Sequence, residues 1–466
     1  MASAGDDQPE QGDLTRRAAL GIVGAGVAPL LRNDQAVTAP TAGLDADRIL
    51  FRQPNRDAVG RSVLDKLRDV VSVKDFGARG DGVANDTAAI QAAFLSGARR
   101  VIFPPGRYLT GALRVPDWLH IQGEAYQPSI GGDGRAAELR FQLRSGAGFT
   151  CGANPVIQNL FIQNIGGIYN EDRKELTGTT AQAISLTENA VIQDCSFSLW
   201  NECIRTGGST YYLKTSRLHF NRCNFGYRTI SGPAYNMHID APHSVLTRAF
   251  IAGKQSYAPR NVKVFGGSIE GYAIVSEFVS EISFFGTYFE TAAPRANVVA
   301  INPRIDRASV ALFGCLIYMN RTARFVSLAG LAGAALTSVG NVFDGIGQSG
   351  GTCLHLPASG TVALHGDRLG SGHPNDCLYL DSIESAVRFN VVLPALPPGN
   401  LQAMFGGLQL MSPRGFAMGR LTAEPSEKVL GMTVMADGRT WDPLRRSSSG
   451  PYWTMWNGER WSPLSG

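Results

Sequence analysis

The sequence predicts an all-β fold, a right-handed parallel β-helix of about ten coils with an N-terminal capping helix and a small C-terminal β module. Two observations lead to it. Over residues 150–390 helical periodicity is poor, while alternation of β-branched and aromatic residues is common. A glycine also recurs after 20, 28, 26 and 26 residues, each time with a large apolar residue three positions later, at Gly266, Gly286, Gly314, Gly340 and Gly366. Stacked coils with one turn glycine and one core residue per coil produce this pattern, and a single coil cannot form a core alone.

The main competing folds are a β-sandwich and a β-propeller. Both need hairpin turns at regular spacing, and Asn-Gly and Asp-Gly pairs flanked by alternating strands are scarce in this region. The composition agrees with one large folded body, since 44% of the 466 residues are hydrophobic, 18% are charged and 54 are glycine. A net charge of +4 without a basic block makes nucleic acid an unexpected partner. No run of about 18 apolar residues predicts a membrane span.

Residues 1–40 have the features of an export signal. Arg16 and Arg17 precede the weakly apolar run GIVGAGVAPLL, and small residues follow at 36–39. This pattern is typical of a twin-arginine signal, which implies a periplasmic or secreted protein. A disordered tail with a chance Arg-Arg pair is the alternative. We then expect a lead-in segment over 41–70, the β-helix over 71–398 and the C-terminal module over 399–466.

Residues 71–94, VSVKDFGARGDGVANDTAAIQAAF, predict the cap of the solenoid. Glycines at 77, 80 and 82 allow tight turns, and Asp86 can cap a helix whose apolar face holds Ile90, Ala93 and Phe94. We interpret the segment's three aspartates as structural: Asp75, Asp81 and Asp86.

This segment, with VIFPPGRY at 101–108, resembles the opening of pectate-lyase-like right-handed β-helix proteins, in particular their rhamnogalacturonase/epimerase-like members. The resemblance implies that the helix covers the open end of the strand stack. It also implies a protein that acts on polysaccharides, because most of the family does. Residues 59–70 resemble the lead-in that phage tailspike proteins place before their β-helix.

The C-terminal segment 429–464 contains four of the six tryptophans and resembles a small β module at the ends of phage tail proteins. Such a module could bind glycan or assist a homotrimer, and a plain packed hairpin is equally compatible with it. Because these segments resemble phage tail proteins, a phage virion tail is the alternative to a periplasmic or secreted location.

Upstream, the apolar column is expected to continue through Phe225, Phe197 and Ile162, at intervals of 44, 28 and 35 residues. The interval of 44 leaves room for one more coil near 245–251, and that of 35 for a protruding loop. Three of the seven cysteines precede column residues by two positions, so their thiols should stack inside the solenoid: Cys195, Cys223 and Cys315. We expect neither a disulfide framework nor a metal site, because ligand-spaced Cys and His clusters are absent from the sequence.

The residue after each column position should point outward, which predicts an outer column of Gln163, Ser198, Gly226, Glu270, Glu290, Tyr318, Asp344 and Gly370. Parallel strands lie about 4.8 Å apart, so two glutamates on neighbouring rungs would have carboxyl groups roughly 5 Å apart. Retaining glycoside hydrolases separate their two carboxyl groups by about 5 to 5.5 Å. At that distance one carboxyl tends to stay protonated while the other is ionised. Glu270 and Glu290 are therefore the first catalytic candidates.

Asp344 is the third candidate, two rungs or about 10 Å beyond Glu290, near the upper limit for an inverting partner. Tyr318 lies between them and could hydrogen-bond a sugar. Outward glutamates on a solenoid are also often plain solvated surface.

A lyase remains open because alternation over 245–251 turns Arg248 outward near Glu270, and lyases of this fold commonly use a basic residue as the base. A salt bridge is the simpler interpretation of Arg248, and a turn that contains two histidines is the simpler interpretation of His238, Asp240 and His243. No cofactor is expected, although calcium stays open; the family's calcium-binding aspartate cluster has no clear counterpart. Sugar rings stack on aromatic faces, so the flanking aromatics Trp200, Tyr211 and Tyr212 are candidate substrate-binding residues, with core packing as the alternative.

The sequence thus favours an exported enzyme that cleaves an acidic, capsular or exopolysaccharide by carboxylate acid–base catalysis. A polysaccharide lyase or uronate epimerase and a non-catalytic glycan-binding adhesin are the two alternatives.

Overall fold

The computed structural model describes these residues: 45–125, 136–173, 175–232, 234–245, 247–271, 274–292, 299–320, 324–344, 352–356, 360–365, 367–369, 378–380, 403–405, 408–410, 420–421, 433–436, 443–444, 452–456 and 459–463. The predicted export signal and the glycines Gly366 and Gly370 lie outside this set. The chain divides into two compact units, Met1–Asp65 and Lys66–Gly466.

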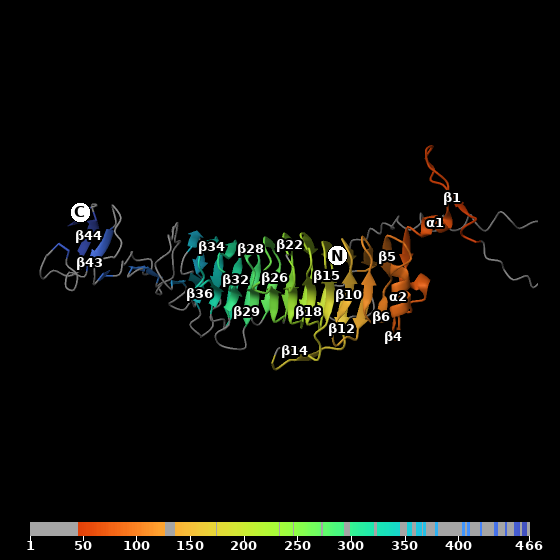
Figure 1. Ribbon diagram of the computed structural model, residues 1–466, viewed down its shortest axis with the longest axis horizontal. Helices are drawn as coiled ribbons and strands as arrows, with labels where there is room; N and C mark the ends of the chain where they lie inside the picture. The colour runs from red at the N-terminus through yellow and green to blue at the C-terminus, as the bar shows by residue number, and fades with distance from the viewer. Residues whose placement is uncertain are drawn as a thin grey trace, which may run out of the picture. The chain divides into compact units, whose positions relative to one another are not determined.

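The second unit contains a parallel β-helix. Its strands follow one another through three parallel sheets, which we call sheets I, II and III in the order in which each coil crosses them (Figure 1). Sheets I and II have twelve strands each and sheet III has eleven, slightly more than the ten coils expected. The prediction of a right-handed parallel β-helix is confirmed.

The strands of sheet I are β3 (Val70–Ser72), β5 (Arg100–Phe103), β8 (His120–Gly123), β11 (Val156–Gln158), β16 (Ala190–Gln193), β19 (Leu213–Ser216), β22 (Met237–Asp240), β25 (Val262–Phe265), β28 (Glu281–Phe285), β31 (Ser309–Phe313), β34 (Ala334–Val339) and β37 (Gly360–His365). The strands of sheet II are β4 (Asp81–Asn85), β6 (Gly106–Thr110), β9 (Ala137–Phe141), β12 (Phe161–Asn164), β17 (Ser196–Ser198), β20 (His219–Asn221), β23 (His243–Val245), β26 (Ser268–Gly271), β29 (Tyr288–Ala292), β32 (Leu316–Asn320), β35 (Val342–Asp344) and β38 (Arg368–Leu369). The strands of sheet III are β7 (Leu113–Val115), β10 (Ala147–Cys151), β15 (Gln182–Leu186), β18 (Glu202–Thr206), β21 (Phe225–Thr229), β24 (Ala249–Ala252), β27 (Ile274–Glu277), β30 (Val299–Asn302), β33 (Arg324–Ser327), β36 (Thr352–Leu356) and β39 (Leu378–Leu380).

Helix α2 (Thr87–Phe94) stands where the first coil would have its sheet III strand, between β4 and β5. Its residue Gln91 donates a hydrogen bond to the Arg114 carbonyl (2.9 Å) and accepts one from the Arg114 N–H (2.8 Å). Arg114 belongs to β7, the edge strand of sheet III, so the helix satisfies backbone groups of a free strand edge. Phe94 is buried against Phe103 and Phe149. The predicted capping role of this segment is confirmed.

The apolar column predicted from the glycine spacing forms the inward row of sheet II. Ile269 pairs with Phe289, Phe289 with Ile317, and Ile317 with Phe343. All four side chains are buried.

One upstream position was wrong. Two coils lie between those of Phe197 and Ile269. Their inward residues in sheet II are Phe220 and then Ser244. Phe225 begins β21 in sheet III instead, and it is only partly buried. The predicted outer-column residue Gly226 is replaced in the same way by Asn221.

Between sheets I and II the coils from β11 to β35 make a short turn with a residue at positive φ. Later coils place Gly266, Gly286, Gly314 and Gly340 there, with φ between 59° and 63°. Consecutive turns stack, since the Gly266 N–H donates to the Phe285 carbonyl and the Gly286 N–H to that of Phe313. Earlier coils use other residues at this turn, also at positive φ: Asn159, Asp194, Arg217 and Ala241.

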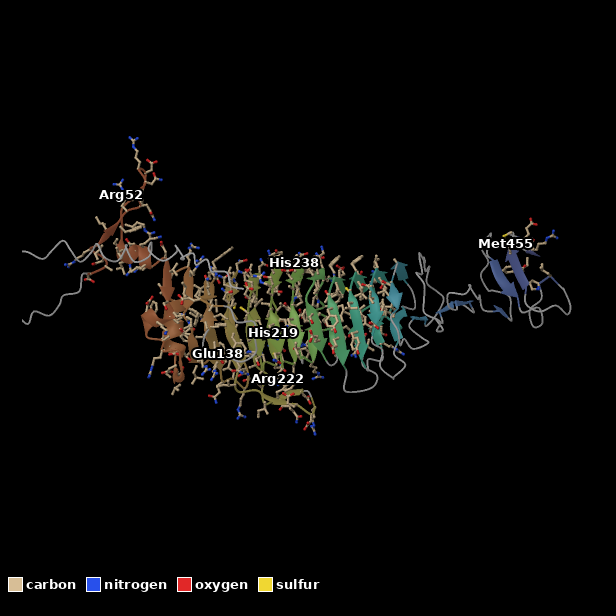
Figure 2. The ribbon with its side chains drawn as sticks, turned by 180° about the vertical axis from the view of Figure 1, so that it is seen from behind. Arg52, Glu138, His219, Arg222, His238 and Met455 are labelled. Atoms are coloured by element: carbon tan, nitrogen blue, oxygen red, sulfur yellow. The ribbon has the colours of Figure 1, made fainter. Side chains whose placement is uncertain are left out.

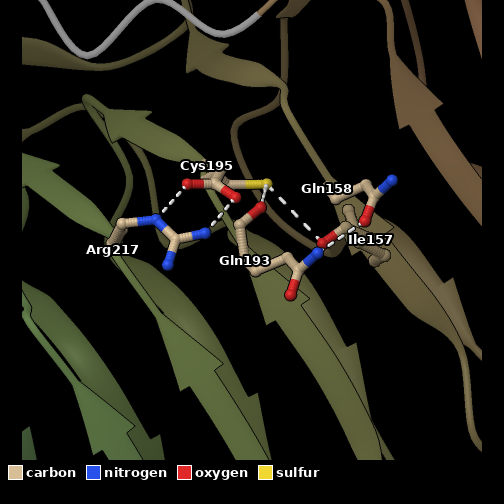
Figure 3. A network of polar contacts seen from close by, with 6 residues as sticks. Ile157, Gln158, Gln193, Cys195 and Arg217 are labelled. Atoms are coloured by element: carbon tan, nitrogen blue, oxygen red, sulfur yellow. Dashed lines mark hydrogen bonds and ion pairs between the residues drawn. The ribbon is translucent and has the colours of Figure 1, made fainter.

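The five cysteines whose side chains the structure describes are buried and free: Cys151, Cys195, Cys203, Cys223 and Cys315. The thiol of Cys195 lies 3.2 Å from the Gln193 carbonyl and 3.8 Å from that of Ile157 (Figure 3). Cys195 and Cys315 precede column residues as expected, whereas Cys223 follows β20 because the column residue of its coil is Phe220.

The long interval between Ile162 and Phe197 contains the predicted protruding loop. It forms an antiparallel hairpin, β13 (Ile168–Asn170) with β14 (Glu175–Thr177), which projects from the coils in Figure 1. Arg222, in the turn after β20, forms an ion pair with Glu171 (2.6 Å) and lies over the ring of Tyr169 (Figure 2). The Asn224 side chain donates to the Leu176 carbonyl (3.2 Å), so contacts from two residues fasten the hairpin to the coils.

The remaining elements are short. The first unit holds the antiparallel pair β1 (Leu50–Phe51) and β2 (Arg61–Ser62), followed by α1 (Val63–Leu67), while the 3-10 helix η1 (Val73–Phe76) precedes β4. Near the C-terminus, β40 (Ala403–Phe405) pairs with β41 (Leu408–Leu410). A four-stranded sheet then contains β42 (Arg420–Leu421), β43 (Thr433–Ala436), β44 (Tyr452–Trp456) and β45 (Trp461–Pro463). Within the described part of the chain, no helix has the length and apolarity needed to cross a membrane.

Candidate functional site

The outward face of sheet II carries two rows of side chains, because residues on either side of each inward position point away from the core. One row runs through His219, His243, Ser268, Tyr288 and Leu316. The other runs through Asn221, Val245, Glu270, Glu290, Tyr318 and Asp344. Glu270 and Glu290 are therefore register partners on neighbouring rungs, about 4.8 Å apart along the sheet.

Glu270 lies beside two polar groups of the first row. The Ser268 hydroxyl donates to Oε1 of Glu270. The same oxygen lies 3.6 Å from Nε2 of His243, which is an ion pair when the imidazole is protonated. The Glu270 side chain is 35% exposed, so it is anchored from within the face and still reachable by a substrate.

Glu290 accepts a hydrogen bond at Oε2 from the Tyr288 hydroxyl (3.1 Å). Burial raises the pKa of Tyr288 to about 12, and the hydrogen bond to Glu290 and the charges of Glu290 and Glu270 act in the same direction. The Tyr288 hydroxyl therefore stays protonated across the neutral range and remains a donor to Glu290.

Tyr318 and Asp344 follow on the next two rungs, as predicted. Tyr318 pairs in register with Glu290, and Asp344 with Tyr318. The Tyr318 side chain is 37% exposed. The face thus presents three carboxylates and two tyrosines within four consecutive rungs.

The face is closed at one end and open at the other. On β17 and β20 its outward side chains are almost completely buried, at 3% to 6% exposure: Ser196, Ser198, His219 and Asn221. The β13–β14 hairpin is fastened to the turn that follows β20, through Arg222 and Asn224 (Figure 2 labels His219 and Arg222). His243, 48% exposed and stacked at 4.5 Å on the His219 ring, marks the start of the open part.

Arg248 is not part of the outward face of sheet II that holds Glu270, where the predicted alternation had placed it. It is exposed in the turn between β23 and β24, where its N–H donates to the Cys223 carbonyl (3.0 Å). The alternation that placed it breaks because Val245 ends a strand of sheet II and Ala249 begins one of sheet III. The basic neighbour of Glu270 is His243 instead.

Trp200 is a core residue, which corrects its prediction as a sugar-binding residue. It is fully buried, its indole N–H donates to the Ile162 carbonyl (3.0 Å), and its ring packs against Phe141.

Tyr211 and Tyr212 are exposed, at 53% and 46%, but they lie in the turn from sheet III to sheet I. In a three-sheet coil this corner is the one opposite sheet II. The two tyrosines therefore do not share a face with Glu270 and Glu290.

Sequence reasoning missed Ser268 and Tyr288, and it left His243 as a turn residue. The spacing in the sequence could have identified them, because each stands two positions before a residue of the outward column and must therefore point to the same face of the sheet. Among the described residues, no three His, Cys, Asp or Glu side chains gather as a metal-binding group.

Comparisons with known proteins agree with this architecture. Residues 70–137 match the family model described as rhamnogalacturonase A/epimerase, pectate lyase-like. A tail spike protein of an Escherichia phage is 46% identical over 56 residues, which is 12% of this chain and 7% of that relative. The chain therefore spans only a small part of the length of this relative.

The similar solved structures are at low identity. ORF18 of Geobacillus virus E2 has 14% identity over 86% of this chain and 76% of that chain, with a TM-score of 0.44. The enzymatically active domain of bacteriophage CBA120 tailspike protein 2 has 14% identity over 75% and 55%, with a TM-score of 0.45. The A-module of the Azotobacter vinelandii mannuronan C-5 epimerase AlgE4 has 14% identity over 72% and 100%, with a TM-score of 0.36. At these values they carry no argument about activity.

The match over residues 70–137 begins at the first strand of the three-sheet solenoid and includes its capping helix. The chain folds as a right-handed parallel β-helix, and its first coils are similar to those of pectate-lyase-like proteins.

Proposed function

We propose that this protein cleaves glycosidic bonds of a polysaccharide on the outward face of sheet II, with Glu270 and Glu290 as the catalytic carboxyl pair. The observation that carries the proposal is their pairing on adjacent rungs of an open face, each held by a neighbouring hydroxyl group. Carboxyl groups about 5 Å apart suit a retaining mechanism, in which one is the nucleophile and the other the acid.

Glu270 is the proposed nucleophile. The Ser268 O–H donates to its Oε1 and the His243 ring lies beside the same oxygen, so two groups hold this carboxyl in position for attack. It attacks the anomeric carbon while Glu290 transfers a proton to the glycosidic oxygen, which leaves as a hydroxyl group. Water then attacks the glycosyl ester of Glu270, with Glu290 as the base, and releases the sugar.

Tyr288 positions Glu290 in this scheme. Its hydroxyl occupies Oε2, which leaves Oε1 for the proton that is transferred. Tyr318, on the next rung, can hydrogen-bond the sugar. Asp344, about 10 Å from Glu290, would act only in an inverting reaction with Glu290 as its partner.

The test is cleavage of a panel of bacterial exopolysaccharides by the full chain and by Glu270→Gln and Glu290→Gln variants. Each variant should lose about 10²- to 10⁴-fold in rate, as expected for removal of an acid–base group. NMR of the first product should show a retained anomeric configuration. Glu281→Gln is the matched control, since Glu281 is exposed in β28 of sheet I.

Equal cleavage by both variants and the parent would contradict the proposal. An inverted first product, together with a loss of activity in Asp344→Asn, would instead assign the acid–base pair to Glu290 and Asp344.

A polysaccharide lyase or uronate epimerase is the second candidate. His243, half-exposed beside Glu270, favours it, because such enzymes need a base for the proton next to a uronate carboxylate. A lyase product absorbs in the ultraviolet and an epimerase changes the sugar ratio, so product analysis separates both from hydrolysis. A glycan-binding adhesin would bind the same polymer without needing either glutamate.

The short match to a phage tail spike protein supports a location in a virion tail or otherwise outside the cell. A homotrimer and an export signal over residues 1–40 remain part of the proposal.

A further inference from the structure

Sheet III bears an arginine cluster on its outward face. Arg205 and Arg228 are register partners on β18 and β21, and Glu277 lies two rungs beyond Arg228 in the same row. The alternate positions Ile204 and Tyr227 are buried in the core, so the row itself points outward.

The guanidinium group of Arg228 turns back along its own strand and lies 4.4 Å from the centre of the Phe225 ring. Phe225 pairs in register with Ala249, the residue next to Arg248. The Arg228 guanidinium group therefore lies over the Phe225 ring near the corner between sheets II and III, close enough to Arg248 for the two charges to act on each other.

Neither of these two arginines makes a side-chain hydrogen bond or ion pair with any described residue, whereas their neighbours do. Arg205 pairs with Glu202, and Arg304 pairs with Glu277 (2.9 Å). Each glutamate of the cluster thus has another arginine as its ion-pair partner, and both act on Arg228 only at longer range.

Arg228 is half-buried, which makes its unpaired charge unusual. Burial lowers the pKa of Arg228, the charges of Glu202 and Glu277 oppose this, and those of Arg205 and Arg248 add to it. Arginine nevertheless stays charged at any working pH. The Arg228 guanidinium group is half-buried, and none of its five N–H groups donates to a described residue. An anion could therefore bind it with little rearrangement of the protein.

We infer that Arg228 and Arg248 form a subsite for the carboxylate group of an acidic sugar. A guanidinium group binds a carboxylate through two parallel hydrogen bonds, and the flat Phe225 ring holds it in the orientation for this. The inference deepens the proposed function and rests on it for the identification of the ligand as part of a polysaccharide.

The subsite lies next to the carboxyl pair along the chain. Val245, the register partner of Glu270, ends β23 three residues before Arg248. A polymer that passes the II–III corner can therefore place one acidic unit on the arginines while a neighbouring linkage lies at Glu270 and Glu290.

The test measures binding by isothermal titration calorimetry to the full-length chain, carrying Glu270→Gln so that no cleavage occurs. The probes are a galacturonate hexamer and its carboxyl-reduced neutral counterpart. The acidic hexamer should bind at least about tenfold more tightly, and Arg228→Gln and Arg248→Gln should each remove about tenfold of its affinity. Binding of the neutral hexamer should not change.

Arg217→Gln is the matched control, because it removes the same charge from an arginine that is already paired with Asp194 at the I–II corner (2.6 Å). Arg228→Lys keeps the charge and loses the two-pronged geometry, so an intermediate affinity is expected. Arg248 is exposed, so its variant should fold even if Arg228 variants do not.

Equal affinity for the two hexamers, no binding of the acidic one, or an equal loss in Arg217→Gln would overturn the subsite. A sulfated neutral hexamer that binds as tightly as the acidic one would overturn the assignment to a carboxylate. If Arg228→Gln weakens acidic binding but Glu270→Gln and Glu290→Gln retain cleavage, only the proposed catalytic pair fails. If the reverse holds, only the subsite fails.

Discussion

Asp86 directs its carboxylate to a turn instead of the helix that it precedes. The N–H groups of Arg79 and Gly80 donate to it at 2.7 and 3.0 Å, and it is 3% exposed. It stands at the start of α2 without a side-chain bond to the helix. The prediction that Asp86 is structural holds, although its partner is the Gly80 turn that precedes the first strand of sheet II.

We expect Asp86→Ala to lower the free energy of unfolding by about 2–3 kcal/mol, because two backbone N–H groups lose a charged acceptor in a buried place. The shift of the urea midpoint measures it. Asp75→Ala is the comparison, since Asp75 accepts from the Ser72 N–H in an exposed capping box and should cost about 0.5–1 kcal/mol. Equal losses in the two variants would mean that burial does not set the cost.

The hairpin β13–β14 shows how one inserted element shapes the face beside it. It is fastened at the turn after β20, and on β17 and β20 the outward side chains Ser196 and Asn221 are each 3% exposed. On the following rungs His243 and Glu270 are 48% and 35% exposed. The open part of the face that carries the glutamates therefore begins where the contacts of the hairpin end.

The hairpin should open more readily in Asn224→Ala, which loses the bonds of the side chain to Leu176 (3.2 Å) and Asn201 (3.0 Å). A loss of about 1 kcal/mol corresponds to roughly fivefold faster amide exchange where that opening governs exchange. Hydrogen exchange over 168–177 is the measurement. Asn236→Ala removes a comparable bond to the Tyr211 carbonyl at the opposite corner, so it should leave the hairpin unchanged. Faster exchange throughout the coils would point to global destabilisation instead.

At the scale of the whole molecule, each coil buries its inward face against its neighbours, so protection of any one core residue depends on the stack. Burial raises the pKa of the Cys151 and Cys195 thiols to about 12 and also raises those of Cys203 and Cys315. Thiolates are the form that reacts with alkylating reagents. Burial therefore slows the reaction of these thiols in two ways, because it keeps the reagent away from the sulfur and keeps the thiol protonated.

Alkylation of the native protein near pH 8, followed by mass spectrometry, should therefore find these four cysteines at least about a hundredfold slower than in the urea-unfolded chain. The unfolded chain is the reference for each site. Native labelling of Cys195 at the unfolded rate would contradict the buried stack.

Much of this architecture could be predicted because the later coils repeat their turn residue. Gly286, Gly314 and Gly340 mark those coils in the sequence, and the register of Glu270, Glu290, Tyr318 and Asp344 followed from them. Earlier coils keep the same backbone turn with other residues, so the glycine signal disappears there.

The errors arose in those earlier coils and at the II–III turn. Arg217 occupies the glycine position of its coil, and Phe225 was consequently taken for the column residue in place of Phe220. Arg248 and Trp200 both lie in II–III turns, where alternation no longer tells inside from outside. The contact of His243 with Glu270 joins two rungs, which the spacing of one coil does not reveal. Ser268 and Tyr288 contact glutamates two positions later on the same strand, so their contacts could have been predicted.

The stacked glycine turns offer a practical consequence. A side chain added at Gly266, Gly286, Gly314 or Gly340 would meet open space, and positive φ would cost about 1–2 kcal/mol. Asp194 and Arg217 occupy the same positive-φ turn in other coils, so the fold accommodates side chains there. Cysteines introduced there would be attachment points for nitroxide or fluorescent labels, at heights that increase by about 4.8 Å per coil. Because the five described thiols are shielded, a chain in which Cys353 and Cys377 are replaced would take labels at the chosen positions, and the solenoid could serve as a spectroscopic distance standard.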